Sequence, residues 1–200
     1  MTQESDLTPP RIRPIDMPLE GITAQRMSKL IPPELAPPQL YLTTARHAKL
    51  WAFMVDSGFI GPTGLMDLRS LPPRLRELVL LRTCVANRCH YEFNLHVQTI
   101  SERMGLTPAL IDDIRQLAPA SSEWSAAERA AIGLVDALVL KREVTDAVFD
   151  SAREHFDDVV LIEITHLVGL YTGVAMMAAL TLPRFDLYRS AEPVLAEPRP

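Results

Sequence analysis

Apolar residues recur three and four positions apart, with polar residues between them, over most of the chain from residue 20 to residue 183. This spacing places apolar side chains on one face of a helix. No segment shows the alternation of a strand beside a hairpin turn, so the pattern predicts an all-α protein. The expected helices span residues 22–30, 39–57, 73–86, 89–104, 108–117, 126–140, 146–155 and 158–181.

Three of these helices begin at recognisable start signals. Thr107 precedes a proline at the first helical position, and Ser125 with Glu128 matches a capping box. Leu71 and the two prolines after it open the helix that is expected from residue 73.

Prolines divide the chain into three parts. Eight of the 17 prolines lie within the first 38 residues, and four lie within the last 18. Because proline lacks the N–H that regular structure needs, we expect an extended, proline-rich arm over residues 1–19 and a loosely held C-terminal tail over residues 184–200. The helical domain is then residues 20–183.

The last expected helix contains a long uncharged stretch, from Ile164 to Pro183. Its length approaches that of a membrane span, but threonines, glycines and a histidine dilute its hydrophobicity and no second span accompanies it. We therefore expect a buried helix and no membrane partner. Gly169 and Gly173 would let another backbone approach closely, which predicts a packed helix pair or a contact between the subunits of a homo-oligomer.

Charge and cysteine content narrow the class of protein. The net charge is −5 and no basic run occurs, which argues against a nucleic-acid partner. The two cysteines, Cys84 and Cys89, follow an N-terminal stretch that contains acids and no apolar signal segment. These features predict free thiols in a reducing cytoplasm.

Candidate chemistry concentrates between residues 74 and 96. Cys89, Glu92 and His96 are three and four residues apart, so one helix would place thiol, carboxylate and imidazole on the same face. A carboxylate beside an imidazole forms a proton-transfer pair, which favours general acid/base chemistry. Glu77, an acid inside an apolar helix, would join them only if the chain breaks near Asn87 and Arg88.

Structural alternatives exist for each of these residues. Glu77 could pair with Arg74 or Arg82, Glu92 could pair with Arg88, and His96 could be a satisfied histidine at a helix edge. A zinc site on Cys89, Glu92 and His96 lacks a second ligand pair at the usual spacing, so no metal is expected. Cys84 fits best as a small buried hydrophobe, because a bridge to Cys89 would need a sharp bend in the chain.

Several aromatic and imidazole side chains on apolar helical faces are candidates for lining a substrate pocket, although histidines in such positions are more often part of the core. They are His47, Trp51, Tyr91, His166 and Tyr171.

The segment from Leu71 to Arg82, followed by Cys89-His-Tyr-Glu-Phe-Asn-Leu-His96, resembles the carboxymuconolactone decarboxylase family, whose superfamily includes alkyl hydroperoxidase D. The resemblance extends over about residues 35–182. It implies an all-helical, alkyl hydroperoxidase D-like bundle that assembles into trimers or hexamers. In the hydroperoxidase branch, a glutamate, a Cys-x-x-Cys pair and a histidine form a proton relay, and the matching residues here are Glu77, Cys89 and His96.

The second cysteine of that motif is Glu92 in this chain, which leaves Cys89 without an adjacent resolving thiol. We therefore expect an acid/base enzyme of the lyase class, acting on a small organic acid, lactone or enolisable carbonyl compound, with or without loss of CO₂. His96 would be the principal acid or base, Glu92 and Glu77 would tune and orient it, and Cys89 would line the pocket without an organic cofactor. The alternatives are a thiol-dependent hydroperoxide reductase using Cys89 and a noncatalytic oligomeric ligand-binding protein.

Overall fold

The computed structural model describes residues 9–197. Within this range the chain forms helices, one π-helical turn (η2) and a two-stranded antiparallel ladder that pairs Ile60 with Leu65. The elements are α1 (Gly21–Ser28), α2 (Gln39–Thr44), α3 (Ala48–Asp56), β1 (Ile60–Gly61), β2 (Gly64–Leu65), α4 (Pro73–Ala86), α5 (His90–Thr99), α6 (Pro108–Ile114), α7 (Ala126–Asp136), η2 (Ala137–Lys141), α8 (Asp146–Arg153) and α9 (Asp158–Thr181).

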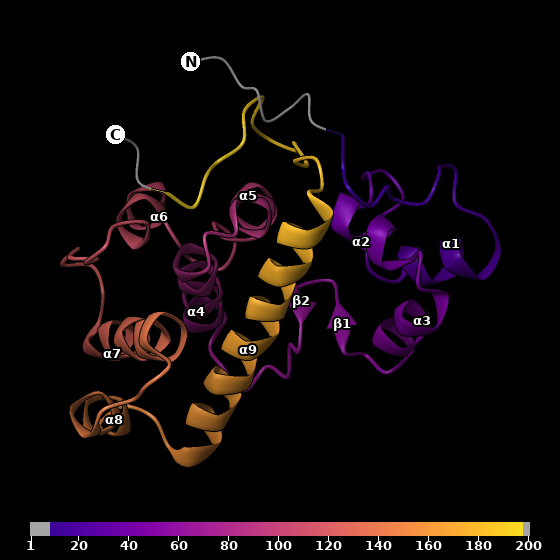
Figure 1. The fold of residues 1–200 in the computed structure, drawn as a ribbon. Coiled ribbons are helices and arrows are strands. Elements are labelled where there is room, and N and C mark those ends of the chain that lie inside the picture. The colour runs from indigo at the N-terminus through magenta and orange to yellow at the C-terminus, as the bar shows by residue number, and fades with distance from the viewer. Residues whose placement is uncertain (1–8, 198–200) are drawn as a thin grey trace.

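Helices α4, α5 and α9 form the centre of the molecule (Figure 1). The N-terminal helices α1–α3 and the short ladder lie on one side of α9, and α6–α8 lie on the other side of α4. Helix α4 therefore packs against both α9 and α7. The polar side chains in the middle of α4, which are Arg76, Glu77, Arg82 and Thr83, are buried and need partners within the protein.

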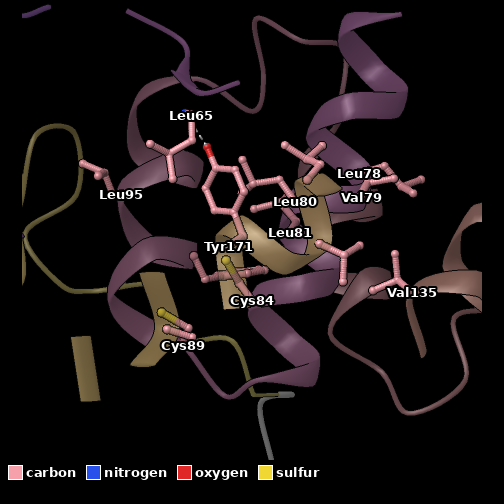
Figure 2. Packing of buried hydrophobic residues seen from close by; sticks show 14 of the residues in the cluster. Leu65, Leu78, Val79, Leu80, Leu81, Cys84, Cys89, Leu95, Val135 and Tyr171 are labelled. Carbon is pink, nitrogen blue, oxygen red and sulfur yellow. Dashed lines mark hydrogen bonds between the residues drawn. The ribbon is translucent and has the colours of Figure 1, made fainter. Parts of the chain in front are cut away.

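The core is densest along α4, where Leu78, Val79, Leu80 and Leu81 are all fully buried (Figure 2). Four successive buried residues cover the whole circumference of a helix, so α4 has no solvent-facing stripe. The buried Arg82 guanidinium of α4 pairs with the Asp136 carboxylate at 2.6 Å and donates hydrogen bonds to backbone carbonyls at the end of α6.

Helix α9 is the one helix among the described residues that is long and apolar enough to cross a membrane by length and composition. In this fold one of its faces packs against α4 and α5, which is the arrangement of a core helix. Its opposite face is exposed, with Ile162 at 59% and Met176 at 63% of full accessibility. Helix α9 is thus half covered within a single chain.

The expected all-helical class is confirmed, as are the bounds of α4 and α9 and the start signals at Thr107, Ser125 and Pro73. The prediction of one helix over residues 39–57 is wrong, because this segment forms two helices, α2 and α3. At this break the Thr43 and Thr44 hydroxyls bond to carbonyls one turn back, and His47 caps α3. Such back-bonding competes with helix continuation.

The ladder β1–β2 is an addition to the expected elements, since two-residue strands are too short to show an alternating pattern. The end of the helix expected over 126–140 is π-helical instead of α-helical from Ala137 onward, and the chain leaves it through a left-handed Arg142 with φ of 55°.

Residues 198–200 lie outside the described range, but over residues 184–197 the tail is held against α5, contrary to the loosely held tail expected over residues 184–200. Figure 1 shows it running from the end of α9 across α5 toward α6. The buried amides of Asn94 and Gln98 hold its backbone: Gln98 Oε1 accepts from Tyr188 N–H at 2.7 Å, and Asn94 Oδ1 accepts from Val194 N–H at 2.9 Å. Proline content could not reveal these anchors, because they lie on another element.

In the N-terminal arm, residues 9–19 contain no helix, and the Arg11 amide donates to the Thr181 carbonyl at 2.9 Å. The rest of the expected arm, residues 1–8, lies outside the described range.

Candidate functional site

The connection between α4 and α5 reverses the chain and brings the candidate residues together. Arg88 adopts a left-handed conformation with φ of 53°. Its N–H donates to the Val85 carbonyl at 3.0 Å, and the Cys89 N–H donates to the Cys84 carbonyl at 2.8 Å. These two bonds are those of a Schellman motif. The break expected near Asn87 and Arg88 is confirmed, and Arg88 is the residue that takes the left-handed conformation there.

This reversal places Glu77 of α4 beside His96 of α5. His96 Nδ1 lies 3.0 Å and 3.1 Å from the two carboxylate oxygens of Glu77, and the Ser101 hydroxyl donates to the same carboxylate at 2.7 Å. On the other side of the ring, His96 Nε2 lies 3.4 Å from Glu92 Oε1. One buried imidazole is therefore held between two carboxylates.

The two carboxylates determine the charge of this imidazole. Burial by itself lowers the pKa of His96, but the charges and hydrogen bonds of Glu77 and Glu92 outweigh it and raise the pKa to about 9. Burial likewise opposes ionisation of Glu77, yet the His96 charge and the Ser101 hydrogen bond hold its pKa below the ordinary value. At neutral pH the pair is thus an imidazolium and a carboxylate.

The structural alternatives for the acids are wrong. Arg74 pairs with Glu128 at 2.6 Å, and Arg82 pairs with Asp136, so neither arginine neutralises Glu77. Arg88 is exposed at the chain reversal. Glu92 instead faces His96.

An apolar cavity of about 280 Å³, the Glu92 pocket, lies against this group. Its walls come from α2, α3, the β ladder, α5 and α9, and Glu92 is the only acidic residue among them. Of the expected pocket residues, Trp51 and Tyr171 line it. His96 lies behind Glu92, with its ring edge-on to Tyr171 at 5.8 Å between centroids.

Two polar groups on the pocket wall have bonding capacity to spare. The Trp51 indole N–H is buried and has no hydrogen-bond partner among the described residues. The Tyr171 hydroxyl accepts from the Leu65 N–H at 3.3 Å, as Figure 2 shows, which leaves its own proton to donate. Burial raises the pKa of Tyr171 well above the ordinary value, so this proton is retained. The pocket therefore offers two donors and one carboxylate.

Three expected pocket residues lie elsewhere. His47 is exposed and caps α3 by accepting from the Leu50 N–H at 3.2 Å. His166 is exposed on the outer face of α9, bonded to the Ile162 carbonyl. Tyr91 is buried, but its hydroxyl accepts from the Leu40 N–H and bonds to Asp186 of the tail. Helical spacing alone could not separate an inner from an outer face at these positions.

Cys89 also faces away from the Glu92 pocket. It borders a separate cavity of about 340 Å³, the Cys89 pocket, between the start of α5 and the end of α9. The expected set thus divides into a buried group of one imidazole and two carboxylates, made of Glu77, Glu92 and His96, and a thiol that borders another cavity. Glu77 itself borders a third cavity, of about 360 Å³, beside Arg76.

Sequence reasoning did not single out Tyr41, Gly64 or Ser101. Tyr41 lines the Glu92 pocket and packs on Trp51 at 5.7 Å between ring centroids. Gly64 has φ of +101°, and a Cβ there would collide with the Tyr171 hydroxyl. Because Gly64 and Tyr171 are far apart in the sequence, the sequence pattern could not show that they lie side by side.

Among the described residues, no group of three His, Cys, Asp or Glu side chains is arranged to hold a metal ion. In the group formed by Glu77, Glu92 and His96, the imidazole contacts both carboxylates.

Comparisons with solved structures show which proteins share this fold. A crystal structure of a protein of unknown function from Agrobacterium tumefaciens, with a suggested role as antioxidant defence protein AhpD, matches with a TM-score of 0.61 and 24% identity over 72% of this chain and 96% of that one. The debrominase Bmp8 matches with a TM-score of 0.69 and 15% identity over 88% of this chain and 92% of that one. A cysteine-to-alanine variant of Bmp8 in complex with 2,3,4-tribromopyrrole matches with a TM-score of 0.65 and 14% identity, covering 90% and 94% of the two chains.

These likenesses show the fold, which is that of an alkyl hydroperoxidase D-like helical protein. A search of curated protein sequences finds no match. The sequence profile of one family does match, over a segment that includes Glu77, Cys89, Glu92 and His96. The resemblance expected from the sequence is thereby confirmed: residues 63–137 of this chain match the model of the carboxymuconolactone decarboxylase family.

Proposed function

We propose that this protein is an acid/base enzyme that moves a proton on a small organic acid, lactone or enolisable carbonyl compound. The observation that carries this proposal is the placement of Glu92 on the wall of an apolar pocket, with a buried imidazolium at 3.4 Å behind it. A carboxylate in water-poor surroundings is a suitable proton acceptor when a fixed neighbouring charge stabilises it.

The pocket favours a substrate with one polar end. Its walls are mostly apolar and aromatic, while the free donors of Trp51 and Tyr171 match an oxygen acceptor such as a carbonyl or carboxylate. A cavity of about 280 Å³ suits a ring or short chain of few heavy atoms. The 2,3,4-tribromopyrrole in the debrominase complex is also a small, flat and largely apolar molecule.

The proposed step begins with the Glu92 carboxylate taking a proton from the carbon next to the substrate carbonyl. The electron pair moves onto the carbonyl oxygen, where the Tyr171 hydroxyl stabilises the developing negative charge. Glu92 then returns the proton to another carbon, which completes an isomerisation. In the decarboxylating version, Glu92 first takes up a proton from solvent, CO₂ leaves from the substrate carboxylate as the electron pair moves onto the carbonyl oxygen, and Glu92 then gives its proton to the carbon that lost CO₂.

In this mechanism His96 and Glu77 are positioning residues, in contrast to the expectation that His96 is the principal acid or base. His96 keeps Glu92 oriented, and Glu77 with Ser101 fixes the imidazolium. Because Glu77 borders another cavity, the three residues also form a route by which a proton could exchange with solvent.

The test is exchange of substrate C–H protons with deuterium, followed by NMR over a panel of enolisable acids and lactones. We expect Glu92→Gln and His96→Ala each to reduce the rate by about 10²–10⁴, the usual contribution of a positioned proton-transfer group. Glu102→Gln, at an exposed acid, is the matched control and leaves the rate unchanged. The proposal is wrong if Cys89→Ser abolishes turnover while the Glu92 and His96 variants keep wild-type rates.

A second candidate function is reduction of hydroperoxides by Cys89. The observation that favours it is that Cys89 borders its own cavity, independent of the Glu92 pocket. In that case Cys89→Ser abolishes peroxide reduction, since serine cannot replace a thiolate nucleophile. Ligand binding to the Glu92 pocket without proton exchange or peroxide turnover would instead favour a noncatalytic binding protein.

We also propose that the protein assembles into a trimer or hexamer through α9. The residues on the exposed face of this helix are alternately four and three positions apart. This spacing is typical of the contact face between two paired helices. These residues are Ile162, His166, Gly169, Gly173, Met176 and Leu180. An apolar face of this length is unusual on a small monomer.

A further inference from the structure

We propose that the cavity beside Arg76 is a second binding site, which takes a small monocarboxylate with a short apolar chain. This cavity, the Arg76 pocket, has a volume of about 360 Å³ and lies between the start of α4, the loop before it and the end of α5. It shares no lining residue with the Glu92 pocket. The proposal therefore concerns binding at a separate place and does not depend on the acid/base function.

The Arg76 guanidinium has a donor that nothing in the described chain accepts. Its side chain is only 7% exposed, and its Nε is buried without a hydrogen-bond partner among the described residues. The two terminal nitrogens donate to the carbonyls of Thr63 and Leu65, which fixes the guanidinium against the β ladder. Nε faces Asp67, another residue of the pocket wall, but the distance of 3.9 Å to Oδ1 is too long for a hydrogen bond. Because an unpaired buried donor is costly, an acceptor that enters the pocket gains this bond.

The charges on the walls favour a ligand with one negative charge. Two arginines, Arg69 and Arg76, line the pocket together with two acids, Asp67 and Glu77. The Glu77 carboxylate is already paired with the His96 imidazolium at 3.0 Å, and the second carboxylate on that imidazole belongs to the other pocket. Asp67 alone therefore opposes two guanidinium groups. The positive charge left in excess attracts a monoanion.

The rest of the pocket determines the class of anion. The remaining walls are largely apolar, and they are formed by Leu71, Pro73, Ile100 and Met104. Apolar walls with a few convergent polar groups are typical of sites for organic ligands, so a short hydrocarbon chain fits better than an inorganic anion. A single water, whose share of liquid volume is about 30 Å³, would leave most of the pocket unfilled. A carboxylate accepts the charge-assisted hydrogen bond that Nε offers, and its chain covers the apolar walls.

The test is titration of the full chain with sodium propionate at constant ionic strength, followed by saturation-transfer NMR and by thermal unfolding. We expect saturable binding and an unfolding midpoint that rises with propionate concentration, because a ligand of the folded state stabilises it. Propionamide has the same size without the charge and should bind at least about tenfold more weakly. The proposal is overturned if propionate does not saturate by about 50 mM, or if propionamide binds equally well. These measurements use the wild-type protein, so they do not depend on the folding of any variant.

Two variants, checked for folding by circular dichroism, place the ligand in the Arg76 pocket. Arg69→Gln removes an exposed guanidinium from the wall and should weaken propionate binding at least about fivefold. Met104→Trp, at a half-buried wall residue, should fill the pocket and abolish binding. Arg76 itself is left unchanged, because it also holds the β ladder.

Two further variants separate this site from the other cavities. Arg184→Gln removes an exposed arginine from the Cys89 pocket, and Trp51→Phe removes the free donor of the Glu92 pocket. Both should keep the propionate affinity within about twofold of wild type, since neither residue lines the Arg76 pocket. If either variant weakens binding while Arg69→Gln does not, propionate occupies another cavity and the proposal is overturned. Loss of binding in the Trp51 variant alone would leave the proposed acid/base site standing.

Discussion

The charge state of His96 makes the stability of this protein depend on pH in a way that one substitution should remove. In the folded protein the pKa of His96 is raised to about 9, whereas an unfolded histidine titrates near the ordinary pKa of 6.5. A group with a raised folded pKa stabilises the fold fully below its unfolded pKa, and this stabilisation is lost as the pH rises through the folded pKa. The free energy of unfolding should therefore fall between about pH 6.5 and pH 9.

The size of this effect follows from the shift, since each pKa unit is worth about 1.4 kcal/mol. The raised pKa of His96 thus corresponds to roughly 3 kcal/mol between about pH 6 and pH 10. Screening by water reduces this little, because the His96 side chain is only 3% exposed and that of Glu77 only 1%. The groups that face the imidazole are Glu77, Glu92 and Tyr171, and Tyr171 stays neutral throughout this range.

The assay is urea unfolding of wild type and His96→Gln at several pH values in this window and at one protein concentration. We expect the stability difference between the two proteins to shrink by roughly 3 kcal/mol from the acidic to the alkaline end. His155→Gln, at an exposed histidine just after the end of α8, is the control and should follow wild type. A constant difference between wild type and His96→Gln across the window would refute the buried imidazolium.

The other predictions concern packing and assembly. Gly64→Ala should destabilise the fold by roughly 2 kcal/mol in urea unfolding, because a Cβ would displace the Tyr171 hydroxyl and the backbone is left-handed there. Ser125→Ala should cost about 1 kcal/mol by the same assay, since it removes one half of the capping box of α7. Met176→Glu should reduce the mass in light scattering to that of one chain, 22.3 kDa, with an unchanged circular dichroism spectrum. Leu117→Glu, at an equally apolar residue that is 95% exposed and outside α9, should leave the assembly intact. Wild-type protein that is itself monomeric at micromolar concentration would contradict the assembly proposal.

Local signals in the sequence were sufficient for the helices and for part of the site. Capping residues act within one turn of the backbone, so Thr107 and Ser125 mark helix starts wherever the helix packs. The spacing of Glu92 and His96 along one helix likewise fixes that they meet, whatever surrounds them. Glu77 is a carboxylate among leucines. Because burying an unpaired charge costs free energy, the sequence alone predicts that Glu77 has a partner.

Which partner Glu77 finds, and which cavity each candidate faces, depended on the tertiary structure. The left-handed turn at Arg88 decides that Glu77 meets His96, because it folds α5 back along α4. The same turn joins Cys84 to Cys89 through one backbone hydrogen bond. By itself the sequence determined an all-helical chain with a proton-transfer pair on one helix. Contacts between residues far apart in the chain determined where the pocket lies, how the tail is held and which way each side chain points. Examples are the contact between Tyr171 and Leu65 and that between Gln98 and the tail. The physical reason is that helical periodicity shows which side chains share a face, whereas only packing against other elements determines what that face contacts.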